Sequence, residues 1–125
     1  MIIYNSSIAR LISKFIMPIE AITLWPFILI TGPKIVDSII LRAEQFYIIH
    51  HETIHLRQWT ECGLLGFILI YIWDYLWNRI VLRKKHEDAY YDIRFEQEAY
   101  SNERDILYLN YRKHYSWKKY RMNHE

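Results

Sequence analysis

The alternation of hydrophobic and polar positions divides the chain into a short extended region followed by helices. Residues 21–30 are rich in Ile, Leu, Thr, Trp and Phe and precede the turn dipeptide Gly32-Pro33, a pattern typical of a strand. We expect a second short extended piece within residues 35–41, pairing back across that turn. The chain has only three glycines and three prolines, and long periodic stretches without these breakers favour helices. The sequence therefore predicts an α+β fold that is mostly α, with a short β-hairpin or small sheet.

A helix is predicted over residues 43–62, which contain no proline or glycine. Gly63 and Gly66 mark a break or tight bend after it. Polar and apolar residues share one face of this helix at helical spacing: Glu44, Tyr47, Ile48, His51, His55, Gln58 and Cys62. The side chains that could take part in metal binding or catalysis therefore lie along one face of this helix.

The C-terminal part of the chain predicts a further helix and a basic tail. Polar residues 83–88 indicate a turn, and residues 89–108 indicate a helix that bears several glutamates. From about residue 111 the chain mixes Arg and Lys with Tyr and Trp, and we expect a loosely ordered tail there. The length of 125 residues fits one domain, residues 1–125, with one modest hydrophobic core.

Residues 64–82 form the most apolar part of the chain. The uninterrupted apolar part, residues 63–73, is too short to cross a bilayer, which needs roughly twenty apolar residues. We favour a core helix, or a helix through which copies of the chain form an oligomer. The alternative is an amphipathic helix on a membrane surface, with aromatic side chains at the level of the headgroups: Tyr71, Trp73, Tyr75 and Trp77.

Composition narrows the class of protein. Apolar residues make up 52% and aromatic residues 17%, which argues against disorder, and the net charge of +2 gives no reason to expect a nucleic-acid partner. The apolar run that follows Arg10 and Lys14 is interrupted by Pro18, Glu20 and Pro26, so we do not expect a cleaved signal peptide. We expect a cytoplasmic protein, either free or attached to a membrane face.

The sequence His-Glu-Thr-Ile-His at residues 51–55 carries the candidate chemistry. Residues four apart on a helix share a face and are separated by about 6 Å along the axis. His51 and His55 can therefore converge on one ion, and zinc favours imidazole nitrogens at about 2.0–2.1 Å. Glu52 points aside, where its carboxylate can act as a general base on metal-bound water without binding the metal.

Catalytic zinc sites use a third protein ligand, and the later helix offers several carboxylates. We prefer Glu96, because it shares its face with Ile93 and Ala99, and a carboxylate among apolar residues is costly to bury unless it is paired or bound to metal. Glu98 is predicted on the opposite, solvated face and is the alternative ligand.

Other polar residues are candidates for orienting the ligands. Glu103 lies two turns after Glu96 and can accept a hydrogen bond from an imidazole N–H, which would fix the tautomer of that histidine. Asp92, one turn before Glu96, is a rival for this role. Gln58, one turn after His55, is expected to hydrogen-bond within the helix packing, with contact to a ligand as the alternative.

The segment HETIHLRQ, followed about forty residues later by FEQEAY, resembles the gluzincin zinc metallopeptidases. It is most similar to small bacterial and phage-type predicted peptidases with HExxHxxQ and FExEAY motifs. The resemblance covers roughly residues 46–103. In the CAAX-type gluzincins an E-x-x-A-D segment supplies the glutamate ligand, which implies Glu96 here, but Tyr100 stands where those enzymes carry aspartate. The resemblance implies a minimal zincin-like core, with the HExxH helix, an apolar helix and a glutamate-bearing helix beside a small sheet.

These residues predict a hydrolase with one Zn²⁺, and the resemblance implies a peptide or protein substrate. Glu52 would take a proton from the metal-bound water, and strand 21–30 could align an extended peptide. Candidate donors to the oxyanion are Tyr90, Tyr91, Tyr100 and His86. The alternative functions are a catalytically silent metal-binding module and a metal-free, membrane-associated helical interaction protein in which the motif is coincidental.

Overall fold

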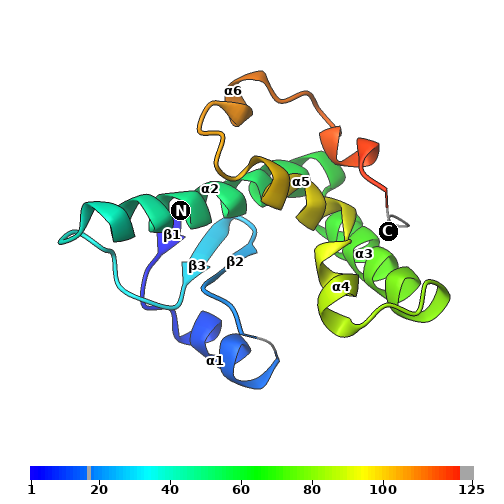
Figure 1. Ribbon diagram of the computed structural model, residues 1–125, viewed down its shortest axis with the longest axis horizontal. Helices are drawn as coiled ribbons and strands as arrows, with labels where there is room; N and C mark the ends of the chain where they lie inside the picture. The colour runs from blue at the N-terminus through cyan, green and yellow to red at the C-terminus, as the bar shows by residue number, and fades with distance from the viewer. Residues whose placement is uncertain (17, 122–125) are drawn as a thin grey trace.

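The computed structural model describes residues 1–16 and 18–121. Its longest element is helix α2, Ile39–Cys62, against which the sheet and several other helices lie (Figure 1). The helix starts four residues earlier than predicted, because the Ser38 side chain accepts a hydrogen bond from the Leu41 N–H and caps the first turn. It ends at Gly63, whose φ of +77° is strained for any residue with a side chain. The predicted strand within residues 35–41 is therefore wrong.

The sheet has three strands in the order β1-β3-β2. Strand β1, Ile2–Ile3, is parallel to β3, Phe27–Ile30, and β2, Ala21–Leu24, is antiparallel to β3. The prediction of one strand over residues 21–30 is wrong, because a turn at Trp25 and Pro26 divides it into a hairpin. Strand β2 forms one edge of the sheet and packs against α2.

The helices after α2 fold back over it. Helix α3, Leu64–Leu76, continues into a π-helical turn η1, Trp77–Val81, and is followed by α4, His86–Tyr91, and α5, Arg94–Asn102 (Figure 1). The single helix predicted over residues 89–108 is wrong. It is interrupted at Ile93, which is extended, and the Arg94 backbone N–H and guanidinium are bound by the Asp74 carboxylate of α3. This ion pair, in which Asp74 is fully buried, fixes the start of α5.

The end of the described chain packs onto the core. Helix α6, Tyr108–Tyr111, and a 3₁₀ turn η2, Ser116–Lys119, follow α5, and the Trp117 side chain is buried against Phe95. The prediction of a loosely ordered tail from residue 111 does not fit the segment up to Arg121. Residues 122–125 lie outside the described residues. The main core joins the aromatic residues Trp59, Phe67, Phe95 and Trp117 to Ile93. The mixed, mostly helical fold predicted from the sequence is confirmed.

The apolar segment lies at the surface with only one side packed. Within the described residues, Leu64–Val81 is one helix that is long and apolar enough to cross a membrane, judged by length and composition alone. Only 17% of the residues in this stretch are buried. The helix of a domain core is mostly buried, so the remaining sides of α3 and η1 are available to something outside the chain.

Candidate metal centre

Three side chains from two helices converge in the interior of the protein. His51 and His55 project from one face of α2, and Glu96 projects from the first turn of α5. The Nε2 atoms of both imidazoles lie 3.1 Å from the same carboxylate oxygen, Glu96 Oε1. The three candidate ligand atoms lie within 4.8 Å of one another, and all three residues are buried. Of the carboxylates considered, it is therefore Glu96 that meets the histidine pair, and this group can hold a metal ion.

The His51 ring nitrogen that does not face Glu96, Nδ1, is held by Glu103, at the C-terminal end of α5. His51 Nδ1 lies 2.9 Å from Glu103 Oε1. A carboxylate at this position accepts a hydrogen bond from Nδ1–H, so Nε2 is the nitrogen that can bind a metal. The neighbouring His50 also contacts Glu103: its Nδ1 lies 2.8 Å from the Glu103 carbonyl oxygen.

The outer nitrogen of His55 is held by Gln58, with Nδ1 2.7 Å from Oε1. The orientation of the Gln58 amide is set by its NH₂ group, which donates to the Phe95 carbonyl oxygen at 3.1 Å and to Glu98 Oε1 at 3.0 Å. Since Gln58 Oε1 can only accept, His55 Nδ1 carries the proton. In both imidazoles Nε2 is therefore the atom that faces Glu96, and it can bind a metal ion once that ion has displaced its proton.

Behind Gln58, Glu98 belongs to a buried ionic network. Glu98 is fully buried and accepts hydrogen bonds from the Tyr108 hydroxyl and the Arg112 guanidinium. Arg112 also binds Glu61 through two hydrogen bonds, of 2.6 and 3.0 Å. The prediction that Glu98 lies on a solvated face is wrong, because α6 and the following segment cover that face. Glu98 lies outside the group of three ligands, and it orients Gln58 instead.

Glu52 lies on the side of α2 that faces the sheet. Its Oε2 atom is 2.6 Å from the Thr23 hydroxyl of β2, and the same hydroxyl is 3.0 Å from the Glu52 carbonyl oxygen. Glu52 is 7% exposed, and it lines a cleft that also contains His55 and Glu96. Edge strand β2 thus fixes this carboxylate beside the three ligands without making it one of them.

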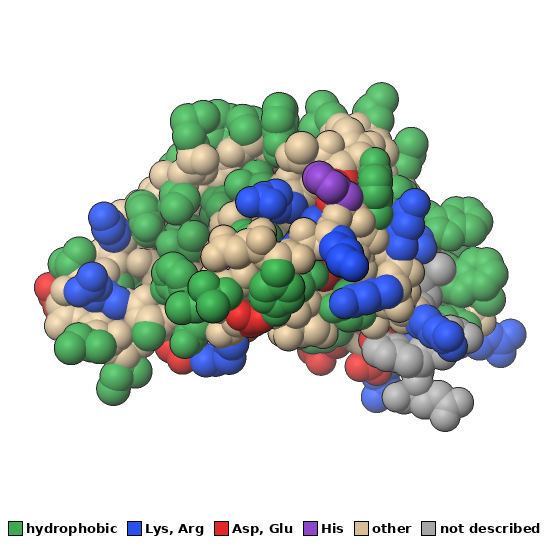
Figure 2. Space-filling model, turned by 90° about the horizontal axis from the view of Figure 1, so that it is seen from above, with side chains coloured by type: hydrophobic (Ala, Val, Ile, Leu, Met, Phe, Trp, Pro, Cys, Tyr) green, Lys and Arg blue, Asp and Glu red, His purple; other side chains and the backbone are tan. Residues whose placement is uncertain are grey.

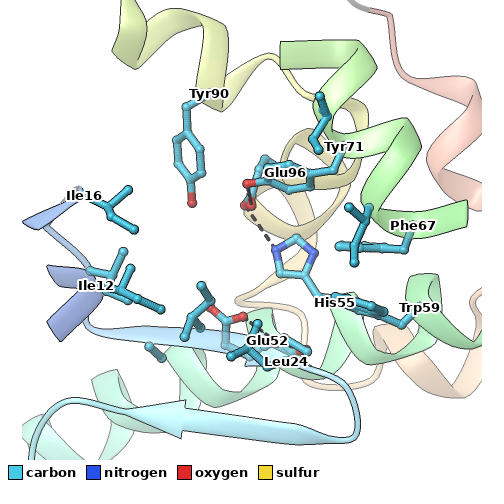
Figure 3. Close-up of a pocket in the computed structure, with 16 residues that line it drawn as sticks. Ile12, Ile16, Leu24, Glu52, His55, Trp59, Phe67, Tyr71, Tyr90 and Glu96 are labelled. Atoms are coloured by element: carbon cyan, nitrogen blue, oxygen red, sulfur yellow. Dashed lines mark hydrogen bonds and ion pairs between the residues drawn. The ribbon is translucent and has the colours of Figure 1, made fainter. Parts of the chain in front are cut away.

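Tyr71, from α3, binds the second oxygen of Glu96. Its hydroxyl donates to Glu96 Oε2 at 2.7 Å (Figure 3 shows the two side chains together). The sequence analysis missed this role, because it considered Tyr71 only as an aromatic residue of an apolar helix. The signal was present, since a buried tyrosine hydroxyl needs a hydrogen-bond partner.

The centre opens into an apolar cleft of about 330 Å³. Its walls come from α1 (Ser7–Phe15) and the residues after it, from β2, and from α3 (Figure 3). A second, more polar cleft of about 510 Å³ adjoins the first and shares four lining residues with it: Ile19, Ala21, Glu52 and Tyr90. Glu52 therefore stands between an apolar and a polar cleft.

The other residues that the sequence suggested as oxyanion donors or orienting groups do not all line the two clefts. Tyr90 lines both clefts, whereas Tyr91 and Tyr100 line the polar cleft, with the Tyr100 ring 4.3 Å from the His51 ring. His86 lines neither cleft, and its Nδ1 lies 2.7 Å from the Tyr75 hydroxyl. Asp92 pairs with Lys84 at 2.6 Å rather than with a ligating histidine. Of these candidates, Tyr90 is therefore the one that lines both clefts.

The surroundings of the three ligands favour positive charge. Burial alone lowers the pKa of His51, but hydrogen bonds to Glu103 and Glu96 outweigh burial and raise it to about 10. The pKa of His55 is also raised against its burial, by the charge of Glu96 and the hydrogen bond to it. Burial raises the pKa of Glu96, but the attraction of the two imidazoles outweighs this and holds it below its ordinary value. In the metal-free protein these shifts favour protonated imidazoles beside an ionised Glu96, and a metal ion has to displace these protons when it binds.

We expect the metal-free protein to lose stability as the pH rises above 6.5. The folded state binds the His51 proton more tightly than the unfolded state, in which the pKa is 6.5. The resulting stabilisation is fully present below pH 6.5 and disappears as the pH rises through about 10. Thermal unfolding of EDTA-treated protein at increasing pH measures this loss, and H51Q should flatten it. A melting temperature of the metal-free protein that stays constant or rises over this range would contradict the assignment.

Comparison of the chain with protein-family models, curated proteins and solved structures found no match. Function is therefore inferred from the geometry of the site.

Proposed function

We propose that this protein is a zinc-dependent peptidase, in which His51, His55 and Glu96 bind one Zn²⁺ and Glu52 acts as the general base. The observation that carries the proposal is the convergence of both Nε2 atoms on Glu96 Oε1, with a separate buried carboxylate, Glu52, on the side of the clefts. Two imidazoles and one carboxylate are a common ligand set of catalytic zinc, and three protein ligands leave a position for water.

Bound zinc would supply a water of lowered pKa and would polarise the scissile carbonyl group. Glu52 would take the proton from this water and return it to the leaving amine. The Thr23 hydroxyl holds one Glu52 oxygen, which leaves the other oxygen for the proton transfer. Tyr90 remains protonated, because burial and the charge of Glu96 raise its pKa far above the ordinary value, so its hydroxyl can donate to the developing oxyanion.

The clefts support a polypeptide substrate. Strand β2 is an edge strand, and its residues Ala21–Leu24 line the apolar cleft, so an extended peptide could pair with its free edge. The wall residues of this cleft are mainly aliphatic and aromatic, among them Trp59, Phe67 and Ile72. We therefore expect an apolar side chain next to the scissile bond.

A peptide library incubated with the zinc-loaded protein tests this proposal, with mass spectrometry as the readout. Cleavage beside apolar residues, abolished by a chelator and restored by added zinc, is expected. Zinc-loaded, folded protein that leaves every peptide of the library intact would favour the catalytically silent metal-binding module.

Replacement of Gln58 by leucine is expected to weaken zinc binding by about 10–100-fold, the usual effect of losing a group that orients a metal-bound histidine. The change removes the acceptor from His55 Nδ1 and leaves the side-chain volume similar. Competition with a chromophoric chelator measures the affinity. The matched control is Q97L, because Gln97 lies on α5 and binds the Asp92 and Arg121 carbonyl oxygens away from the ligands. Equal zinc affinity of Q58L and Q97L would show that the contact to His55 is unimportant.

A further inference from the structure

Helix α3 and its continuation η1 carry a stripe of exposed apolar side chains along one side. The exposed fractions reach 72% for Leu65, 65% for Leu69, 59% for Trp73 and 69% for Ile80. These residues follow one another at intervals of about one helical turn or its multiples, so they form one continuous stripe. The opposite side of the same helix is packed inside the protein through Phe67, Asp74 and Asn78. The exposed stripe is therefore not required by the fold of the chain itself.

A second exposed apolar stripe lies on α1. Ile8, Leu11 and Phe15 are 56%, 59% and 69% exposed, while Ala9 on the inner side is fully buried. The polar side of this helix carries Arg10 and Lys14, both exposed. A short helix with apolar residues on one exposed side and basic residues on another has the character of an interfacial helix.

The two stripes border the same cleft. Ile12 and Ile16 of the α1 region face Phe67 and Tyr71 of α3 across the apolar cleft (Figure 3). Ile16 and Ile72, which line this cleft, are themselves 74% and 49% exposed, so the apolar lining of the cleft reaches the surface on both elements. Hydrophobic side chains protrude at the right-hand end of the space-filling view, the end of the molecule at which α3 lies in Figure 1 (Figure 2).

The charges on these two elements are complementary to an anionic surface. Five exposed basic side chains lie on these elements and in the segment that follows η1: Arg10, Lys14, Arg79, Arg83 and Lys85. Lys84 of the same segment is paired with Asp92. The single acidic residue within 7–16 and 64–85 is Asp74. Asp74 is fully buried and paired with Arg94, so it does not offset the basic residues at the surface. Trp73 and Trp77, exposed by 59% and 37%, add the aromatic side chains typical of the headgroup region of a membrane.

Contacts inside the protein limit the orientations that α3 can take at a bilayer. A membrane-crossing helix would carry the Asp74–Arg94 pair and the Tyr71–Glu96 hydrogen bond into the hydrocarbon region. These contacts instead tie one side of α3 to α5 and the metal centre. The exposed side is therefore suited to lie along a surface.

We propose that the exposed stripes of α1 and α3 bind the surface of an anionic lipid bilayer, with both helices in the plane of the interface and the mouth of the apolar cleft turned toward the lipid. Apolar side chains enter the interfacial region, and the basic residues bind lipid phosphates. This proposal concerns where the protein acts, and its test requires neither zinc binding nor catalysis.

Co-sedimentation of the full chain with lipid vesicles tests the proposal. One set of vesicles is phosphatidylcholine alone, and the other contains one part in four of phosphatidylglycerol. We expect binding to the anionic vesicles that weakens with added salt. L69E and W73E should each weaken partitioning by at least about tenfold, because each puts a charge in the apolar stripe. The matched control, I40E, replaces a residue that is 77% exposed on α2 and lines neither cleft, and it should bind as the wild type does.

Three outcomes would overturn the proposal. The first is wild-type protein that remains in the supernatant with both kinds of vesicle. The second is a stable dimer by light scattering, without vesicle binding, that L69E converts to a monomer, which would assign the stripe to a second copy of the chain. The third is vesicle-bound protein that resists alkaline carbonate, which would indicate a helix that crosses the bilayer. Release by carbonate supports binding in the plane of the surface.

Discussion

The E52Q protein is expected to bind zinc like the wild type and to hydrolyse peptides about 10²–10⁴-fold more slowly, the usual contribution of a general acid–base group. Glutamine has nearly the shape of glutamate, and its carbonyl oxygen can still accept the hydrogen bond of the Thr23 hydroxyl. The link between α2 and edge strand β2 should therefore persist. Only the ability to accept and return a proton is removed.

Zinc content and initial rates of peptide cleavage, measured on the same preparation, test this expectation. The matched control is E20Q, since Glu20 is exposed, lines the polar cleft and lies outside the group of three ligands. E20Q should keep its activity. If E52Q retained full activity with zinc bound, Glu52 would not be the base. If E52Q lost its zinc, the loss of activity would reflect the metal site instead.

The E96Q protein is expected to lose zinc affinity by more than about 100-fold, which exceeds the usual effect of removing a group outside the ligands. Glu96 Oε1 is the atom on which both imidazoles converge, and an amide lacks the negative charge that attracts the cation. The same change should lower the pKa of His51 and His55, because Glu96 is a main cause of the rise in both.

Comparing the zinc affinities of several variants distinguishes the metal ligand from the residues that only orient a ligand. E103Q keeps an oxygen that can accept a hydrogen bond from His51 Nδ1–H, so it should lose only about 10–100-fold in zinc affinity. Zinc titrations of the wild type, E103Q and E96Q give the order directly. Wild-type affinity in E96Q would exclude Glu96 as a ligand.

The sequence was sufficient for the features that depend on local periodicity. The spacing of His51 and His55 requires only one uninterrupted helix, and that helix is α2. The preference for Glu96 over Glu98 followed from its apolar neighbours Ile93 and Ala99, which are buried in the structure. These inferences depend only on which residues share a helix face, and the structure does bring His51, His55 and Glu96 together.

Features that depend on contacts between distant segments could not be derived in this way. The burial of Glu98 requires α6 and Arg112, which fold over the face that periodicity assigns to solvent. Thr23 meets Glu52 only because β2 packs against α2. Similarly, the interruption at Ile93 reflects the pairing of Asp74 with Arg94 twenty residues away, so the predicted single helix was divided by a tertiary contact.

The central claim is that His51, His55 and Glu96 share one divalent cation. Anomalous diffraction at the zinc absorption edge, from crystals of the zinc-loaded wild-type protein, tests it most directly. We predict one anomalous peak within bonding distance of both Nε2 atoms and of Glu96 Oε1, at about 2.0–2.2 Å from each. A peak elsewhere, or no peak while Glu96 still accepts hydrogen bonds from both imidazoles, would contradict the account.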